Sequence, residues 1–291
     1  MSLLLFLLNL LPKRFAEVLM RFLAWLLHAL GVRRSIAREN LAIAFPELSV
    51  AERNALARRN YLHLGTCAAD FLRSPKLGDE ELSRLVDPGD WAKVEPYLKE
   101  KKGFVVATAH HGSFELFGVY AARQGVPLTI LTRVLKGKAN SRWVGTRALA
   151  GIKELHKGWE NLFKSVEAGE VLALLIDQNM LPKRAVFVPF FGRVAATTAA
   201  PAIVAEKTGA PVFLALMVRR PGGTYRIEVE GPFHFERRSQ ERQQDILAFT
   251  AMLNDRLEAK IRENPEQWFW IHRRWKTRPP EESAAAAAPS A

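Results

Sequence analysis

The chain of 291 residues contains one cysteine, Cys67, and lacks several common cofactor motifs. A single cysteine excludes an intrachain disulfide and a Cys-based zinc or iron–sulfur site, and it is consistent with a reducing compartment. The glycine fingerprints of dinucleotide-binding and P-loop proteins are missing, as are the His-Glu-x-x-His and His-x-x-Glu-His patterns of zinc enzymes. We therefore expect neither a bound cofactor nor a metal.

Acidic residues are few relative to basic ones, with 30 Asp and Glu against 42 Lys and Arg and a net charge of +12. This surplus favours an anionic partner: nucleic acid, phospholipid or a phosphorylated metabolite. Hydrophobic residues make up 48% and charged residues 25%, which excludes wholesale disorder. No zinc-finger, helix-turn-helix or RNP pattern is present, so a basic nucleic-acid-binding protein is a remote alternative.

The N-terminus lacks an uninterrupted apolar run of the roughly 20 residues that a spanning helix needs. Residues 3–11 are nearly all apolar, residues 12–14 (Pro-Lys-Arg) interrupt the run, and residues 15–30 resume it around Glu17 and Arg21. Positive charge follows the apolar stretch, which argues against a signal peptide. The segment either lies in or on a bilayer, with basic residues at the headgroups, or packs on the core as a soluble hairpin. We favour membrane attachment and leave open whether the segment spans.

The rest of the chain predicts an α/β fold with a mostly parallel central sheet flanked by helices. A capping box at Ser49 and Glu52 begins a helix that runs to about Leu72. Residues 103–109 form a short apolar run that is typical of a buried strand. Beyond it, apolar strands alternate with helices, which indicates a parallel sheet. The further strands are expected over 126–131, 171–176, 211–218 and, antiparallel at the edge, 225–229; helices are expected over 79–86, 90–99, 115–122, 139–150, 159–168, 200–207 and 239–263.

This pattern divides the chain into three parts. Residues 1–35 form the membrane-associated helical segment, and residues 36–278 form the main domain. Residues 279–291 are rich in Ala, Ser and Pro and are expected to be a disordered tail.

Two of the predicted strands end in residues suited to catalysis, and ligands of open α/β sheets bind beyond the carboxyl ends of the strands. The first strand is followed by His110-His111-Gly112-Ser113-Phe114-Glu115, and residues 171–176 by Asp177-Gln178-Asn179. A histidine and a carboxylate in this arrangement form the base and orienting group of a hydrolase, without its nucleophile. A substrate hydroxyl would then attack directly. Alternatively, these side chains could simply be solvated on a surface loop and have no catalytic role.

The motif His110-x4-Glu115 resembles that of the glycerolipid and lysophospholipid acyltransferases. Its surroundings are most similar to those of the bacterial lipid A biosynthesis (lauroyl/myristoyl) acyltransferases, although Ser113-Phe114 stands where Asn-Trp is commoner. Further blocks follow in family order over most of the chain: residues 38–41 (Arg-Glu-Asn-Leu), 45–49 (Phe-Pro-Glu-Leu-Ser), Arg147 with Gly151, Asp177-Gln178, 188–192 (Val-Pro-Phe-Phe-Gly), 208–211 (Thr-Gly-Ala-Pro) and 265–268 (Pro-Glu-Gln-Trp).

The resemblance implies an enzyme at the cytoplasmic face of the inner membrane. It would move a fatty acyl group from an acyl carrier protein or coenzyme A to a hydroxyl of an anionic glycolipid, with a lipid A precursor as the favoured acceptor. A phosphatidylinositol mannoside or a lysophospholipid is the alternative acceptor. The resemblance makes His110 the general base, with His111 as a rival, and makes Glu115 the residue that orients and charge-stabilises it.

Three further residues are candidates for binding substrate. Arg147 would contact a phosphate or an oxyanion, since guanidinium suits both; a surface salt bridge is its other use. Arg133 is a second candidate cation. Asp177 could orient Arg147 or the acceptor, or cap the following turn. Residues 190–192 are expected to pack, and they could form a wall beside an acyl chain. Trp268, Trp270 and Trp275 suit either a membrane interface or ordinary packing.

Overall fold

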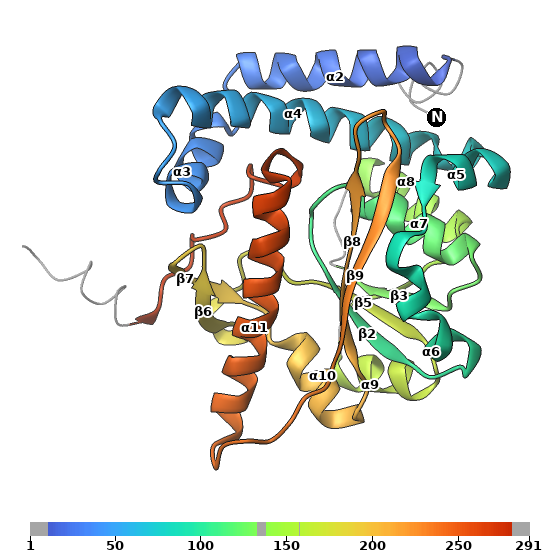
Figure 1. The fold of residues 1–291 in the computed structure, drawn as a ribbon, viewed down its shortest axis with the longest axis vertical. Helices are drawn as coiled ribbons and strands as arrows, with labels where there is room; N and C mark the ends of the chain where they lie inside the picture. The colour runs from blue at the N-terminus through green and yellow to red at the C-terminus, as the bar shows by residue number, and fades with distance from the viewer. Residues whose placement is uncertain (1–10, 133–137, 157, 281–291) are drawn as a thin grey trace, which may run out of the picture.

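The computed structural model describes residues 11–132, 138–156 and 158–280. Its centre is a seven-stranded sheet of order β1-β9-β8-β2-β5-β3-β4, with helices on both faces (Figure 1). Every neighbouring pair in this sheet is parallel except β8 and β9. The expected α/β class with a mostly parallel sheet is confirmed. The strands are β1 (Val86–Asp87), β2 (Phe104–Thr108), β3 (Leu128–Leu131), β4 (Lys153–Leu155), β5 (Val171–Leu175), β8 (Val212–Arg219) and β9 (Tyr225–Phe233).

The strand over residues 225–229 is antiparallel, as expected, but it is not the edge of the sheet. The two-residue β1 pairs with β9 on its outer side. A segment this short carries too little apolar alternation to be recognised in the sequence. The same reason applies to β4. A separate antiparallel hairpin, β6 (Val186–Phe190) with β7 (Arg193–Thr197), was also not expected.

Most helices follow the expected segments with small shifts at their ends, but the helix over Arg34–Ala44 was not expected. The region 90–99, expected as one helix, is divided into a 3-10 turn over Gly89–Lys93 and the short α6. Pro96 lies in the first turn of α6, where proline is tolerated because that amide needs no partner. The helices are α2 (Lys13–Ala29), α3 (Arg34–Ala44), α4 (Val50–Arg73), α5 (Asp79–Leu85), α6 (Glu95–Lys99), α7 (Phe114–Arg123), α8 (Lys138–Leu149), α9 (Trp159–Glu167), α10 (Ala200–Thr208) and α11 (Arg242–Glu263).

Two apolar cores lie on the two faces of the sheet because alternate residues of each strand point to opposite faces. Val105 and Ala107 of β2 join a core with residues of α9, α10 and α11, together with Trp268, Trp270 and Trp275. Phe104 and Val106 join the other core, which α5, α6 and α7 cover. The second of these cores contains the pocket described below.

The described part of the N-terminal segment is helix α2, which lies along α4 (Figure 1). The two helices approach closely at Gly65, where an added Cβ would lie 2.6 Å from the carbonyl oxygen of Met20. On the other side of α2, large apolar side chains are exposed: Phe15, Val18, Phe22, Trp25, Leu26 and Leu27. These side chains therefore do not pack on the core in the way the hairpin alternative requires. Attachment to a membrane stays a prediction.

Within the described ranges, no single helix combines the length and apolar character needed to cross a membrane. α2 and α3 satisfy that criterion only as a pair, with a bend of 86° between them. The expected tail from residue 279 lies almost wholly outside the described residues.

Candidate active site

His110 and Asp177 meet because β2 and β5 are parallel neighbours. Thr108 pairs with Leu175 at the ends of these strands, so the residues two positions further along emerge side by side. The ring Nδ1 of His110 lies 2.9 Å from Oδ1 of Asp177, and the backbone N–H of His110 donates to Oδ2 at 3.0 Å. The carboxylate thus fixes both the ring and the backbone of the histidine.

A third donor reaches Asp177 from the C-terminal part of the chain. Nε1 of Trp268 donates to Oδ2 at 2.8 Å. Burial raises the pKa of Asp177, but the attraction of His110 and the hydrogen bonds from His110 and Trp268 outweigh it, and the pKa lies below its ordinary value. Asp177 is therefore a buried carboxylate that stays ionised and acts only as an acceptor.

The other ring nitrogen of His110 faces an amide. Nε2 of His110 lies 3.0 Å from Nε2 of Gln178, which can only donate. In the matching tautomer, Nδ1 carries the proton shared with Asp177, and Nε2 presents its lone pair. The His110 side chain keeps 15% of its surface exposed, and the rings of Phe114 and Phe269 lie beside it, with centroids at 4.7 and 5.8 Å. The His110 ring is therefore partly exposed, with the Gln178 amide at its Nε2.

The backbone after His110 is held by two distant segments. The N–H groups of Phe269 and Gly112 donate to the carbonyls of His110 and Gln267, respectively, and the N–H of Ser113 donates to Met217. Gly112 adopts a positive φ of 59°, and an added Cβ would lie 1.9 Å from the carbonyl oxygen of Met217. Only glycine fits this turn, which leads directly into α7.

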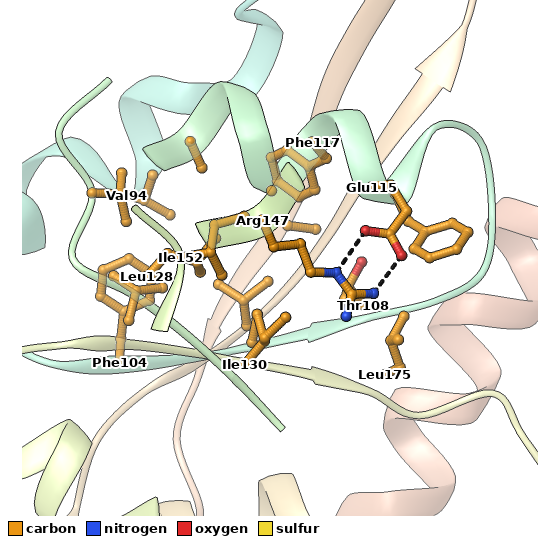
Figure 2. Close-up of a pocket in the computed structure, with 18 of the residues that line it drawn as sticks. Val94, Phe104, Thr108, Glu115, Phe117, Leu128, Ile130, Arg147, Ile152 and Leu175 are labelled. Carbon is orange, nitrogen blue, oxygen red and sulfur yellow. Dashed lines mark hydrogen bonds and ion pairs between the residues drawn. The ribbon is translucent and has the colours of Figure 1, made fainter. Parts of the chain in front are cut away.

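Glu115, in the first turn of α7, forms an ion pair with Arg147 near the end of α8. Nε of Arg147 donates to Glu115 at 3.0 Å, and a second, very short bond from Nη2 makes the contact bidentate (Figure 2). Nη1 also donates to Glu154 at 3.2 Å. Burial lowers the pKa of Arg147, but the two glutamates outweigh it and raise the pKa above its ordinary value.

An apolar pocket extends from this ion pair along the sheet. Figure 2 shows Glu115, Arg147 and Thr108 at one end and Val94, Phe104 and Leu128 at the other. β2, β3 and β5 form one wall, and α7 forms the opposite wall through Phe117 and Gly118. Phe114 belongs to the pocket lining and touches the ring of His110, so the pocket opens beside the His–Asp pair.

The structure distributes the predicted site residues over two adjoining groups. His110 and Asp177 form one group, and Glu115 and Arg147 form the other. The carboxylate at Nδ1 of His110 is Asp177, so the role predicted for Glu115 is not carried by a contact at that atom. Arg133 lies outside the described residues. The rival His111 is fully buried, which lowers its pKa to about 4, whereas His110 is accessible.

Two expectations about aromatic residues are settled by burial. Trp268, Trp270 and Trp275 are at most 5% exposed, so they pack in the core and do not lie at a membrane interface. Phe190 and Phe191 are buried in the same core, against Trp268 and Trp270, and do not line the pocket. Phe190 ends β6, and residues 191 and 192 form the turn into β7.

Sequence reasoning missed Gln178 as the partner of Nε2, Trp268 as a donor to Asp177 and Glu154 as a partner of Arg147. Trp268 lies 91 positions from Asp177, and nothing local in the sequence connects them. Gln178 carried a signal, because it directly follows Asp177 at a strand end. The described residues include no group of three or more His, Cys, Asp or Glu side chains placed to hold a metal ion.

Comparison with known proteins identifies relatives along nearly the whole chain. The family model for bacterial lipid A biosynthesis acyltransferases matches residues 1–277. The lipid A biosynthesis palmitoleoyltransferase of Escherichia coli is 30% identical over 87% of this chain and 81% of its own length. The lauroyltransferase of the same organism is 25% identical over 85% and 80%. The phosphatidylinositol mannoside acyltransferase of Mycolicibacterium smegmatis is 24% identical over 84% and 78%.

The family match covers the His110 loop, the strand ends, the pocket and the segment around Trp268. The match therefore includes every residue of the candidate site that the structure describes, and it does not rest on one short motif. The protein therefore belongs to the bacterial lipid A biosynthesis acyltransferase family and is an acyltransferase.

Proposed function

We propose that this protein transfers a fatty acyl group from a thioester of acyl carrier protein or coenzyme A to a hydroxyl of a lipid A precursor. The observation that carries the proposal is the partly exposed His110–Asp177 pair, which lies beside Phe114, a residue that lines an apolar pocket. The pair supplies a base for the hydroxyl, and the pocket suits a hydrocarbon chain.

In this reaction, Nε2 of His110 removes the proton of the acceptor hydroxyl while its oxygen attacks the thioester carbonyl. The C–S bond breaks, and the proton held on His110 passes to the departing thiolate. Asp177 keeps the ring in the reactive tautomer and stabilises the imidazolium, as its three hydrogen bonds and lowered pKa support. The acceptor hydroxyl must first displace the Gln178 amide from Nε2.

In this proposal, Glu115 holds the side chain of Arg147 at the mouth of the pocket. The bidentate pair fixes the guanidinium where negative charge develops on the thioester oxygen or where a substrate phosphate lies. Direct orientation of His110 by Glu115, the role that the family motif implies, stays a prediction. Asp177→Asn and Glu115→Gln separate the two roles because only the first changes the contact at Nδ1.

Helix α2 would place the site at the inner membrane. Its outward face exposes Phe15, Phe22 and Trp25, and the same helix carries the basic residues Lys13, Arg14 and Arg21. Exposed apolar side chains with adjacent cations favour binding to anionic phospholipid at the cytoplasmic surface.

The proposal is tested by mass spectrometry of lipid A from cells that lack the protein. We expect the profile to lack one acyl group and the wild-type gene to restore it. His110→Ala should fail to restore it, and Asp177→Asn should lower the kcat of the purified enzyme about 10⁴-fold. His234→Ala is the control because His234 is exposed and lies in the loop after β9.

An unchanged lipid A profile would overturn the proposed acceptor, and full rescue by His110→Ala would overturn the base. The similarity to a phosphatidylinositol mannoside acyltransferase supports one second candidate, the same transfer onto that glycolipid. Assays of the purified enzyme with both acceptors decide between them.

A further inference from the structure

The segment over residues 266–272 is held on one side by the side-chain amide of Asn60. This residue lies in α4 and is fully buried. Its Nδ2 donates one hydrogen to the carbonyl of Glu266, at 2.9 Å, and the other to the carbonyl of Trp268. An amide NH2 group has two hydrogens to donate, so both are used. Asn60 thereby fixes two carbonyls that lie two residues apart.

Asn40 repeats this arrangement further along the same segment. It lies in α3 and is only 4% exposed. Its Nδ2 donates to the carbonyls of Trp270 and His272, at 2.7 and 2.6 Å. Together, the two amides hold the carbonyls of every second residue from 266 to 272. In an extended chain, successive residues direct their backbone groups to opposite sides, so the residues between these four face the other way.

The opposite side of the segment faces the loop that carries the base. The carbonyl of Gln267 accepts from the N–H of Gly112, and the N–H of Phe269 donates to the carbonyl of His110, both at 3.0 Å. Residues 266–272 are therefore bonded to α3 and α4 on one side and to the His110 loop on the other.

Two side chains of the segment also bond to the turn that follows β5. Nε1 of Trp268 donates to Asp177 at 2.8 Å, and Nε2 of His272 accepts from the backbone N–H of Asn179 at 3.0 Å. The carbonyls of Trp268 and His272 are among the four that the amides hold, one by each amide. A shift of the backbone at these carbonyls would therefore also move the side chains that reach the turn.

We propose that Asn40 and Asn60 are positioning residues for acyl transfer. Their amides set the register of residues 266–272 and so keep Trp268 bonded to Asp177. A slip by one residue would direct the wrong backbone groups to the amides and take the indole away from the carboxylate. The inference rests on the proposed function, to which it adds two residues that act through this segment.

The first test is steady-state kinetics of the purified full-length protein with an acyl carrier protein thioester and a lipid A precursor. Asn60→Ala leaves two carbonyls without their donor and frees the backbone of Trp268. We expect kcat to fall about tenfold with KM nearly unchanged, since the change removes no contact with substrate. Asn40→Ala should change kcat and KM in the same way.

Asn254→Ala is the matched control. Asn254 lies in α11 and is also fully buried, and its Nδ2 donates to the carbonyl of Pro189 at 2.9 Å and to Oγ1 of Thr197 at 3.4 Å. This amide therefore holds the β6–β7 hairpin and not residues 266–272. The control variant should lower the midpoint of urea unfolding by an amount similar to that of Asn60→Ala but keep the wild-type kcat.

A double-mutant cycle shows whether Asn60 acts through Trp268. If Asn60→Ala and Trp268→Phe each lower kcat about tenfold, independent effects would multiply to about a hundredfold in the double variant. We expect the double variant to stay within about threefold of Trp268→Phe, because the bond that Asn60 supports is already gone. Asn254→Ala should not change the kcat of Trp268→Phe.

Hydrogen exchange gives a readout that needs no turnover. The amides of Gly112 and Phe269 are donors between the segment and the His110 loop. Asn60→Ala should speed their exchange at least about tenfold relative to the wild type, whereas Asn254→Ala should leave their exchange unchanged.

The outcomes separate this proposal from the proposed function. If Asn40→Ala and Asn60→Ala keep the kcat of Asn254→Ala, or if the losses in the double-mutant cycle multiply, the positioning role is overturned and acyl transfer stands. If exchange at Gly112 and Phe269 accelerates as expected but the wild type transfers no acyl group to a lipid A precursor, the hold on the segment stands and the proposed function is overturned.

Discussion

Asp177 accepts hydrogen bonds from the ring and the backbone of His110 and from the indole of Trp268. The last of these can be removed with little change of shape. Trp268→Phe deletes a bond to a buried carboxylate, and such bonds are worth about 1.5 to 3 kcal/mol. We expect kcat to fall about tenfold or more with KM nearly unchanged, because Asp177 positions the base and does not bind substrate.

Trp270→Phe is the control for this substitution. Trp270 is equally buried, packs against Trp268 and donates to the carbonyl of Pro265 instead. The Trp270→Phe variant should lose a comparable amount of its free energy of unfolding but keep the wild-type kcat. Equal losses of kcat in the two variants, measured by steady-state kinetics, would show that the bond to Asp177 has no special role.

At the scale of single residues, the sequence identified His110 and Asp177 as candidates but did not predict that they contact each other. His110 and Asp177 were both recognised as residues that follow strands. The carboxylate chosen to orient His110 was Glu115, because proximity in the chain is the only proximity a sequence displays. The order of β2 and β5 in the sheet, which brings Asp177 to Nδ1, depends on packing between distant segments.

At the scale of elements, the loop between β2 and α7 depends on Gly112. Its positive φ disfavours any side chain, and a Cβ would also collide with Met217. We expect Gly112→Ala to lower the free energy of unfolding by about 3 kcal/mol or more and to reduce kcat, since the loop carries His110. Urea unfolding and steady-state kinetics measure the two effects.

Gly209→Ala separates the effect of the positive φ from the effect of a collision between the added Cβ and its surroundings. Gly209 ends α10 with a φ of 71°, but an added Cβ there meets nothing within 4 Å. It should lose only about 1 kcal/mol from the unfavourable φ and keep its activity. Similar losses for both variants would mean that Met217 yields easily and that the loop is not fixed by this contact.

The elements that the sequence predicted well are those with strong periodicity or caps. α4 begins at the Ser49–Glu52 capping box as expected, and β2, β5 and β8 match their apolar runs. The sequence did not predict β1, β4 or the β6–β7 hairpin. These strands are short, and their structure depends on pairing and packing with neighbouring segments. The pocket was also invisible, since it exists only when β2, β3 and β5 face α7.

At the scale of the whole molecule, buried histidines make stability depend on pH. Burial lowers the pKa of His63 to about 3 and of His111 and His272 to about 4. The unfolded chain protonates these rings near pH 6.5, while the folded chain does not. The free energy of unfolding should therefore fall as the pH drops from 6.5 to 4, and these groups should have no effect above 6.5.

His111→Gln tests this expectation. At pH 5 the wild type should lose about 2 kcal/mol through His111 alone relative to pH 7.5, and the variant should lose less by that amount. Urea unfolding at both pH values measures the difference. His234→Gln, at an exposed position, should keep the wild-type slope. Identical slopes for all three proteins would contradict the role of His111.

The segment from Gln267 to Phe269 contacts the His110 loop and, through Trp268, Asp177. During synthesis, the ribosome must therefore extend the chain past residue 269 before the base and its carboxylate acquire their native arrangement. A growing chain whose N-terminal helix has already emerged would remain inactive toward nearby lipids until then. Translation itself thus delays the onset of acylation.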